Sequence, residues 1–260
     1  MERLCDLLFE LSNEDRLRIL FELEKENFKL SHIAKKLDFT VQETSRNLTR
    51  LLKSQLVTKT PDGAYEITSY GRQSIRMLSG YQFVSMHSDY FSRHDLSNLP
   101  QKFLTRFGEL IDCQQVNQLM EAFGLVEKLL EEAEEYYLYI AKEPLVSGSG
   151  IVLARDALDR GVIGKGIEPM DFVPSKNIMY SVPEDVLNDL ARHRIKGDVK
   201  HRFLERVNFS LFMNEKEVVF DFPDSKGEFN FQGFTSTDPK ALEWCKELFE
   251  YYWEKGVQKV

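Results

Sequence analysis

Hydroxyl, amide and basic side chains gather between residues 40 and 59 of this chain. Gln and Asn can hydrogen-bond the edge of adenine, and Arg can bind guanine through two parallel hydrogen bonds. Thr, Ser and Lys side chains suit contacts to phosphate. The segment therefore predicts recognition of double-stranded DNA by a set that comprises Thr40, Gln42, Glu43, Thr44, Ser45, Arg46, Asn47, Thr49, Arg50, Lys53 and Lys59.

The distribution of charge agrees with this prediction, although the total charge does not. The chain has 260 residues and a net charge of −8, which is unlike a protein that coats nucleic acid. Residues 29–76, however, hold nine Lys and Arg against four acids, so this segment carries +5 and the remainder −13. A basic segment within an acidic chain is typical of a local phosphate-binding surface.

Local signals predict the helices that must position these side chains. We expect a helix over residues 13–26 capped by Ser12, and a short helix over residues 32–37 after Ser31. Thr40 then caps a third helix over residues 41–54, with Glu43 at the spacing of a capping box. Its buried side is expected to hold Val41, Thr44 or Ser45, Leu48, Leu51 and Leu52, and its exposed side Gln42, Glu43, Arg46, Asn47, Arg50 and Lys53.

A hairpin and a long helix follow the three helices. Residues 56–60 and 64–68 are strand-like, and Pro61-Asp62-Gly63 between them is a strong turn signal. A helix from Ser69 to about Phe91 is our candidate for dimerisation and for relaying signals. This order of elements is that of a winged helix-turn-helix, in which residues 41–54 would enter the major groove and the wing at 56–68 would contact the backbone.

The segments at residues 30–37 and 40–51 resemble the ArsR- and MarR-like winged-helix superfamily. Members share a small residue on the first helix of the pair, here Ala34, and a start rich in Thr and Ser on the second. They also tend to end this region in Gly-Leu-Val. Here Gln55-Leu56-Val57 takes that place, a departure that alters the turn but not the hairpin.

The second half of the chain predicts an α/β domain. We place the boundary near the polar segment 94–100, which gives a DNA-binding domain at 1–94 and an effector domain at 95–260. Strands and helices alternate in the second part, which favours an α/β fold. The expected strands are 135–141, 163–167, 177–181, 209–213, 218–222 and 228–234, and the expected helices are 101–108, 115–133, 152–160, 183–194 and 239–255.

Two segments of this second part resemble archaeal regulators of the methanogenesis-regulator (Fil-type) group. They are residues 99–104, Leu-Pro-Gln-Lys-Phe-Leu, and residues 238–253, which run from Asp-Pro-Lys-Ala-Leu to Tyr-Tyr-Trp. The resemblance implies a transcription regulator from an archaeon. It also implies an α+β winged helix-turn-helix domain followed by an α/β effector domain that is distantly phospholipase-D-like.

Phospholipase-D catalysis needs His, Lys and Asp at the spacing HxKxxxxD, and neither His193 nor His201 supplies it. Gly148-Ser149-Gly150 lacks the third Gly of a dinucleotide fingerprint, and Gly164-Lys165-Gly166 is no phosphate loop. We therefore expect no enzyme, no metal and no cofactor. Two weaker alternatives stay open for the polar residues: an anion pocket from His193, His201, Lys196, Lys200, Arg202 and Arg206, and a metal site from His87, Asp89, His94 and Asp95.

These observations favour a DNA-binding transcription regulator that acts as a homodimer, with a small-molecule effector left open. An α/β enzyme acting on a small anionic substrate, fused to a targeting module, is the alternative. A winged helix that contacts only protein is a third interpretation. The chain shows neither a signal peptide nor an apolar run long enough for a membrane span, so we expect a cytoplasmic protein without a membrane partner.

Overall fold

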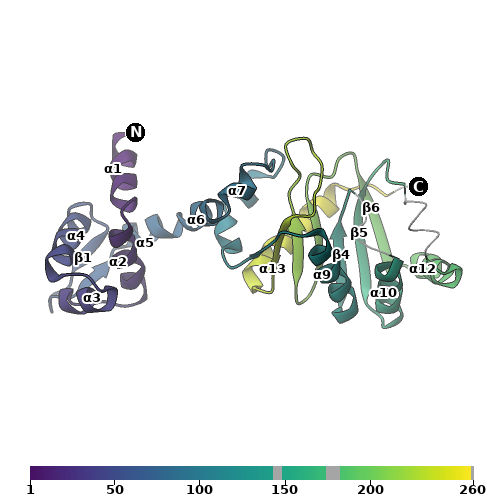
Figure 1. Cartoon of the computed structure of the whole chain (residues 1–260), viewed down its shortest axis with the longest axis horizontal. Helices are drawn as coiled ribbons and strands as arrows, with labels where there is room; N and C mark the ends of the chain where they lie inside the picture. Colours follow the sequence, from purple (N-terminus) through teal and green to yellow (C-terminus); the bar gives the residue numbers. More distant parts are fainter. Residues whose placement is uncertain (143–147, 174–181, 259–260) are drawn as a thin grey trace. The chain divides into compact units, whose positions relative to one another are not determined.

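The computed structural model describes residues 1–142, 148–173 and 182–258 (Figure 1). The chain divides into two compact units, Met1–Tyr81 and Gln82–Val260. The sequence suggested a boundary near residue 94. The difference arises because Phe83 and Tyr90 are fully buried in the core of the second unit.

The N-terminal unit is built from helices around a small hairpin. Ile19, Leu20, Leu48 and Leu51 are buried at its centre, so helices α2 and α4 supply much of its core. Its elements are α1 (Glu2–Leu11), α2 (Glu14–Lys25), α3 (Leu30–Leu37), α4 (Val41–Lys53), β1 (Val57–Lys59), β2 (Tyr65–Ile67) and α5 (Ser69–Arg76).

The helices begin close to where the sequence predicted, but two caps differ. Asn13, rather than Ser12, accepts the backbone N–H of Arg16 and starts α2. Helix α3 begins after Lys29, which makes no side-chain cap. Asp38 adopts a left-handed conformation with φ of 58° and ends α3, so the chain reverses within a few residues before α4 begins.

The prediction of a single long helix from Ser69 to about Phe91 is wrong. Three helices occupy this stretch: α5, α6 (Ser79–Met86) and α7 (Ser88–Phe91). The first break follows Met77, where the N–H of Leu78 turns back to the carbonyl of Ile75 and the next residues are Ser and Gly, which disfavour a helix interior. The second break is at His87, whose φ of −114° and ψ of 33° leave the helical range.

The second unit contains a seven-stranded sheet in the order β3-β9-β8-β7-β4-β5-β6. Strands β4, β5 and β6 are parallel to one another, and the other pairs are antiparallel. The mixed α/β architecture predicted for this part is confirmed. The strands are β3 (Gln114–Val116), β4 (Tyr136–Ile140), β5 (Ile163–Pro169), β6 (Val199–Leu204), β7 (Ser210–Asn214), β8 (Val218–Asp221) and β9 (Gly233–Ser236).

Helices cover both faces of this sheet. Successive residues of a strand point to opposite sides, so β4 contributes side chains to the cores on both faces. Leu138 and Ile140 of β4 join the core beneath α13 (Pro239–Lys255), with α8 (Gln101–Leu104) and the 3₁₀ turn Phe107–Leu110. Tyr137 and Tyr139 face the other core, beneath α9 (Leu119–Glu132), α10 (Gly148–Asp159) and α12 (Glu184–Lys196).

Some elements of the second unit differ from the sequence prediction. Gln114–Val116 forms β3 where a helix was expected to begin, and that helix starts only at Leu119. The segment expected as helix over residues 101–108 splits into α8 and the 3₁₀ turn, and the uncertain strand at 228–234 lies later, at Gly233–Ser236. Strand β6 was not predicted at all. The strand expected at 177–181 lies outside the described residues.

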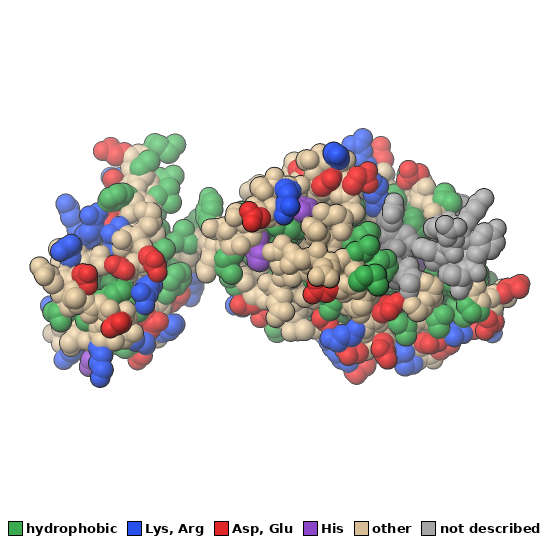
Figure 2. Space-filling model, viewed as in Figure 1, with side chains coloured by type: hydrophobic (Ala, Val, Ile, Leu, Met, Phe, Trp, Pro, Cys, Tyr) green, Lys and Arg blue, Asp and Glu red, His purple; other side chains and the backbone are tan. Residues whose placement is uncertain are grey.

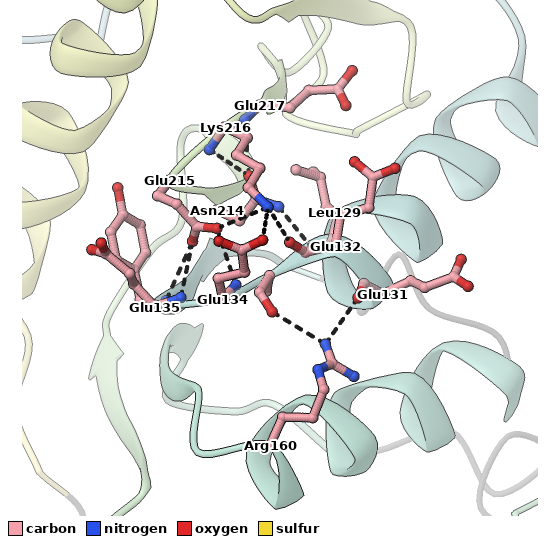
Figure 3. Close-up of polar contacts among 12 residues, drawn as sticks. Leu129, Glu131, Glu132, Glu134, Glu135, Arg160, Asn214, Glu215, Lys216 and Glu217 are labelled. Atoms are coloured by element: carbon pink, nitrogen blue, oxygen red, sulfur yellow. Dashed lines mark hydrogen bonds and ion pairs between the residues drawn. The ribbon is translucent and has the colours of Figure 1, made fainter.

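The C-terminal end of α9 is fixed by side chains from two other segments, residues 214–216 at the end of β7 and Arg160 after α10 (Figure 3). The last carbonyls of a helix lack partners within it. Here Asn214 donates to the Leu129 carbonyl at 2.9 Å and Lys216 to the Glu132 carbonyl at 3.0 Å. Arg160 donates to the carbonyls of Leu130, Glu131 and Ala133 at 2.9–3.2 Å. These bonds hold α9 in place over the sheet.

In the described parts of the chain, no helix is both long and apolar enough to cross a membrane.

Candidate nucleic-acid interface

Helix α4 begins at a complete capping box. The Glu43 N–H donates to the Thr40 hydroxyl oxygen at 3.2 Å, and the Thr40 N–H donates to the Glu43 carboxylate at 3.0 Å. The Thr40 hydroxyl also donates to this carboxylate at 2.7 Å, which lowers the pKa of Glu43 below its usual value. The predicted capping box is confirmed. The Glu43 carboxylate is therefore already used in starting the helix.

One face of α4 presents polar side chains to solvent. Gln42, Ser45, Arg46, Thr49 and Lys53 are all exposed, and their spacing of three or four residues places them along one side of the helix. Among the described residues, neither Arg46 nor Lys53 has an ion-pair partner, so both charges are available to an outside anion. These five residues are called the exposed row below.

Two side chains that the sequence assigned to DNA contact are buried instead. Thr44 is fully buried, and its hydroxyl donates to the Thr40 carbonyl at 2.9 Å. Asn47 is only 8% exposed, so its predicted place on the exposed face is wrong. Val41, predicted to be buried, is 63% exposed. The buried side of the helix runs through Thr44, Asn47, Leu48 and Leu51, because these positions face α2, α3 and β1.

Arg50 is engaged within the protein. Its Nη2 donates to Glu10 Oε1 at 2.6 Å and its Nε to Oε2 at 3.1 Å, and the guanidinium lies 5.1 Å from the Phe9 ring centroid. The hydrogen bond from Arg50 lowers the pKa of Glu10. Arg16 adds a second contact to Glu10 at 3.1 Å. This cluster joins α1 to α4, and residues 40 positions apart carry no local signal that could have revealed it.

Other basic side chains of this unit are also exposed. Lys59 on β1 and Lys35 on α3 are exposed, and Lys59 lies 5.6 Å from the Tyr65 ring centroid. Lys36 is instead paired with Glu22 at 2.8 Å. The unit has 13 Lys and Arg against 12 Asp and Glu, a net charge of +1, whereas the rest of the chain carries −9. Figure 2 shows basic and acidic side chains interspersed on the visible face of this unit.

The basic residues at 193–206 do not form a single anion pocket, so that alternative is wrong as stated. His193 on α12 is held between Asp159 and Asp198, each at 2.9 Å, and both carboxylates raise its pKa. Arg202 on β6 lies 4.8 Å from the Trp253 ring centroid and donates to the Trp253 carbonyl.

The two histidines of the segment 87–95, considered above as possible metal ligands, instead contact other groups of the protein. His87 Nδ1 lies 3.2 Å from Gln115 Oε1. His94 Nδ1 lies 2.7 Å from the Tyr90 carbonyl, and the His94 ring stacks on that tyrosine at 3.7 Å. Within the residues that the structure covers, no three His, Cys, Asp or Glu side chains gather into a metal site.

Comparison with known families supports the resemblance of the second unit. Residues 157–255 match the family described as "Methanogenesis regulatory protein FilR1, middle domain". The resemblance to the Fil-type group predicted from the sequence is thus confirmed for these residues. No curated protein matches the chain.

Solved structures give weaker likenesses. A structure of TrmBL2, described as an archaeal chromatin protein with a novel mode of DNA binding, is 16% identical over 95% of this chain and 94% of its own, with a TM-score of 0.43. NucT from Helicobacter pylori is 13% identical over 57% of this chain and 98% of its own, with a TM-score of 0.41. A phospholipase D family member, Nuc from Salmonella typhimurium, is 15% identical over 52% of this chain and 89% of its own, with a TM-score of 0.37. At TM-scores under 0.5, these likenesses decide neither fold nor function.

Proposed function

We propose that the protein is a DNA-binding transcription regulator whose N-terminal unit acts as a winged helix-turn-helix. Helix α4 would enter the major groove, and the hairpin β1–β2 would lie along the phosphate backbone. The second unit would act in regulation or assembly rather than in catalysis. The observation that carries the proposal is the exposed row on α4, which has two cations without an ion-pair partner among the described residues, on a helix whose start is fixed by a capping box.

The structure narrows the set of side chains that would contact DNA. Gln42 and Arg46, in the first half of α4, are the candidates for base edges, since the first residues of a recognition helix meet the bases. Ser45, Thr49, Lys53 and the hairpin residue Lys59 are the candidates for phosphate. Thr44 and Asn47 are buried, and Glu43 and Arg50 already have partners, so we assign them to positioning α4.

The family match supports the regulatory part of the proposal, since the matched domain is that of a methanogenesis regulatory protein. We further propose a homodimer, because one winged helix covers only a short half-site. Met77 and Tyr81, which follow α5 in the N-terminal unit, are 77% and 75% exposed. Large apolar side chains exposed along one short stretch are typical of surfaces that pack against a partner.

The test is binding of the full chain to DNA from upstream of its own gene, measured at two salt concentrations against a scrambled duplex. We expect specific binding that weakens steeply as salt rises, because phosphate contacts release counterions. Arg46→Ala should weaken specific binding by about 5- to 150-fold if Arg46 reads a guanine. Arg3→Ala makes the same change of charge away from the exposed row and is the matched control.

Equal affinity for the specific and the scrambled duplex would contradict a sequence-specific regulator. If Arg3→Ala weakened binding as much as Arg46→Ala, the effect would come from total charge, and Arg46 would be removed from the interface. Analytical ultracentrifugation of the chain with and without the duplex tests the dimer.

A further inference from the structure

A cavity of about 390 Å³ lies between the sheet and the helices on one face of the second unit. Its walls are mostly apolar: Leu129 of α9, Ile151 of α10 and Leu190 of α12 face Phe212 of β7. Protein cores are close-packed and hold few voids larger than a water molecule. A space of this size and lining is instead typical of a site for a small apolar ligand.

The floor of the cavity is kept open by two glycines. Tyr137 and Tyr139 on β4 lie beside Gly164 and Gly166 of the neighbouring strand β5, where a Cβ atom would collide with the tyrosine rings. The Tyr139 ring also stacks on Phe212, with centroids 5.9 Å apart and planes 11° apart. The motif Gly164-Lys165-Gly166 therefore gives the two rings room to lie across the sheet as an aromatic floor.

One end of the cavity is polar. His201 of β6 lines it, and the Nδ1 atom of this histidine is buried without a hydrogen-bond partner in the described parts of the chain. Arg194 of α12 also lines the cavity and, among the described residues, has no ion pair. Burial of His201 lowers its pKa, so the ring stays neutral and can donate one hydrogen bond. Glu168 is nearby, but its carboxylate already accepts the Tyr139 hydroxyl at 2.6 Å and is not part of the lining.

We propose that this cavity binds an apolar monocarboxylate, with its chain between the helices and its carboxylate at Arg194 and His201. The unpaired guanidinium supplies the charge, and the unpartnered imidazole nitrogen supplies a hydrogen bond. Arg194 and Leu190 belong to α12, so a bound ligand connects this helix to the strands beneath it. Binding of the ligand does not depend on the proposed function of the N-terminal unit.

Isothermal titration of the full chain with hexanoate, octanoate and decanoate tests the proposal. We expect each added pair of methylenes to tighten binding by about 15-fold, because each buried methylene contributes about 0.8 kcal/mol. Decanol, which lacks the charge, should bind at least tenfold more weakly than decanoate. Arg194→Ala should remove that difference, whereas Arg192→Ala, an exposed residue on the same helix, should retain it.

A larger side chain inside the cavity tests its location. Ala154→Phe should abolish decanoate binding, and its melting temperature reports whether the variant folds. Ala191→Phe serves the same purpose at a more exposed position of the lining.

The proposal is overturned if decanoate does not bind, or if both folded variants bind it as the natural chain does. Equal affinity of decanoate and decanol would overturn the role of Arg194 and His201. The DNA-binding assay is independent of the ligand titration. A chain that binds decanoate but not DNA would refute the proposed function alone, and the reverse result would refute this inference alone.

Discussion

Asp221 is fully buried in β8, and its ionisation should make the stability of the second unit depend on pH. Its Oδ2 atom has no hydrogen-bond partner among the residues that the structure describes. Burial raises the pKa of this carboxyl from 3.8 to about 7, although hydrogen bonds from Ser210 and the Phe231 backbone oppose the shift. In the unfolded chain the same group ionises near its ordinary value.

The direction of the effect follows from these two pKa values. The buried carboxyl is more stable in its neutral form. Its contribution to the free energy of unfolding is therefore fully present below about pH 4 and is lost as pH rises towards 7. A shift of about three units corresponds to about 4 kcal/mol in total. Between pH 5 and pH 8, the free energy of unfolding should fall by about 3 kcal/mol through this group alone.

Urea unfolding at pH 5, 6, 7 and 8 measures this loss. Both tryptophans of the chain, Trp244 and Trp253, lie in the second unit, so their emission follows that unit alone. Asp221→Asn keeps the shape and removes the titration. Other titratable groups are common to the natural chain and the variant, so the difference between the two chains isolates Asp221.

Asp112→Asn changes an exposed carboxyl in the same unit and is the matched control, for which we expect a curve parallel to that of the natural chain. If the difference between Asp221→Asn and the natural chain stayed constant from pH 5 to pH 8, the reasoning about burial would be refuted.

Three further substitutions test local features. Gly166→Ala should lower the free energy of unfolding of the second unit by about 1–3 kcal/mol, because the new methyl group meets the Tyr139 ring. Gly124→Ala, in α9 with open space around it, should raise it by about 0.5–1 kcal/mol, and tryptophan emission in urea compares the two. Glu10→Gln should lower the free energy of unfolding of the N-terminal unit by about 1 kcal/mol at pH 7. Because the folded pKa of Glu10 is lowered, its contribution is present above its unfolded pKa and is lost as pH falls. Circular dichroism during acid titration should therefore show a flatter acid limb for Glu10→Gln, and an unchanged limb would show that the pair with Arg50 contributes nothing.

Features encoded by neighbouring residues could be predicted from the sequence. Thr40 and Glu43 are three positions apart and fix the start of α4, and Asp62-Gly63 fixes the hairpin because Gly63 adopts a φ of 85°. The periodicity of α13 likewise gave its bounds without error. In each case the interaction that decides the structure lies within one or two turns of the chain.

Features that depend on distant partners could not be predicted. Arg50 looks like a DNA contact until Glu10, 40 residues earlier, is placed beside it. Asn47 has a polar side chain at a position that the packing of α4 buries. Strand β6 contains Lys200, His201 and Arg202, and three consecutive polar residues predict a solvent-exposed segment rather than a strand. Its place in the sheet depends on pairing with β5, which the local sequence does not show.

The cavity shows the same limit in another form. Its lining comes from helices and strands spread over nearly 90 residues, and no short motif marks it. The Gly164 and Gly166 pair was visible in the sequence, but its role depends on tyrosines of the neighbouring strand.

The outer edge of β6 has a consequence for how the protein can be handled. Beyond the end of α13, Val257 exchanges two backbone hydrogen bonds with Phe203, at 2.8 and 3.0 Å, and so covers part of this open edge. An uncovered strand edge can pair with other molecules and promote aggregation. A chain shortened after Lys255 would lose this cover, whereas an affinity tag placed before Met1 leaves Val257 in place.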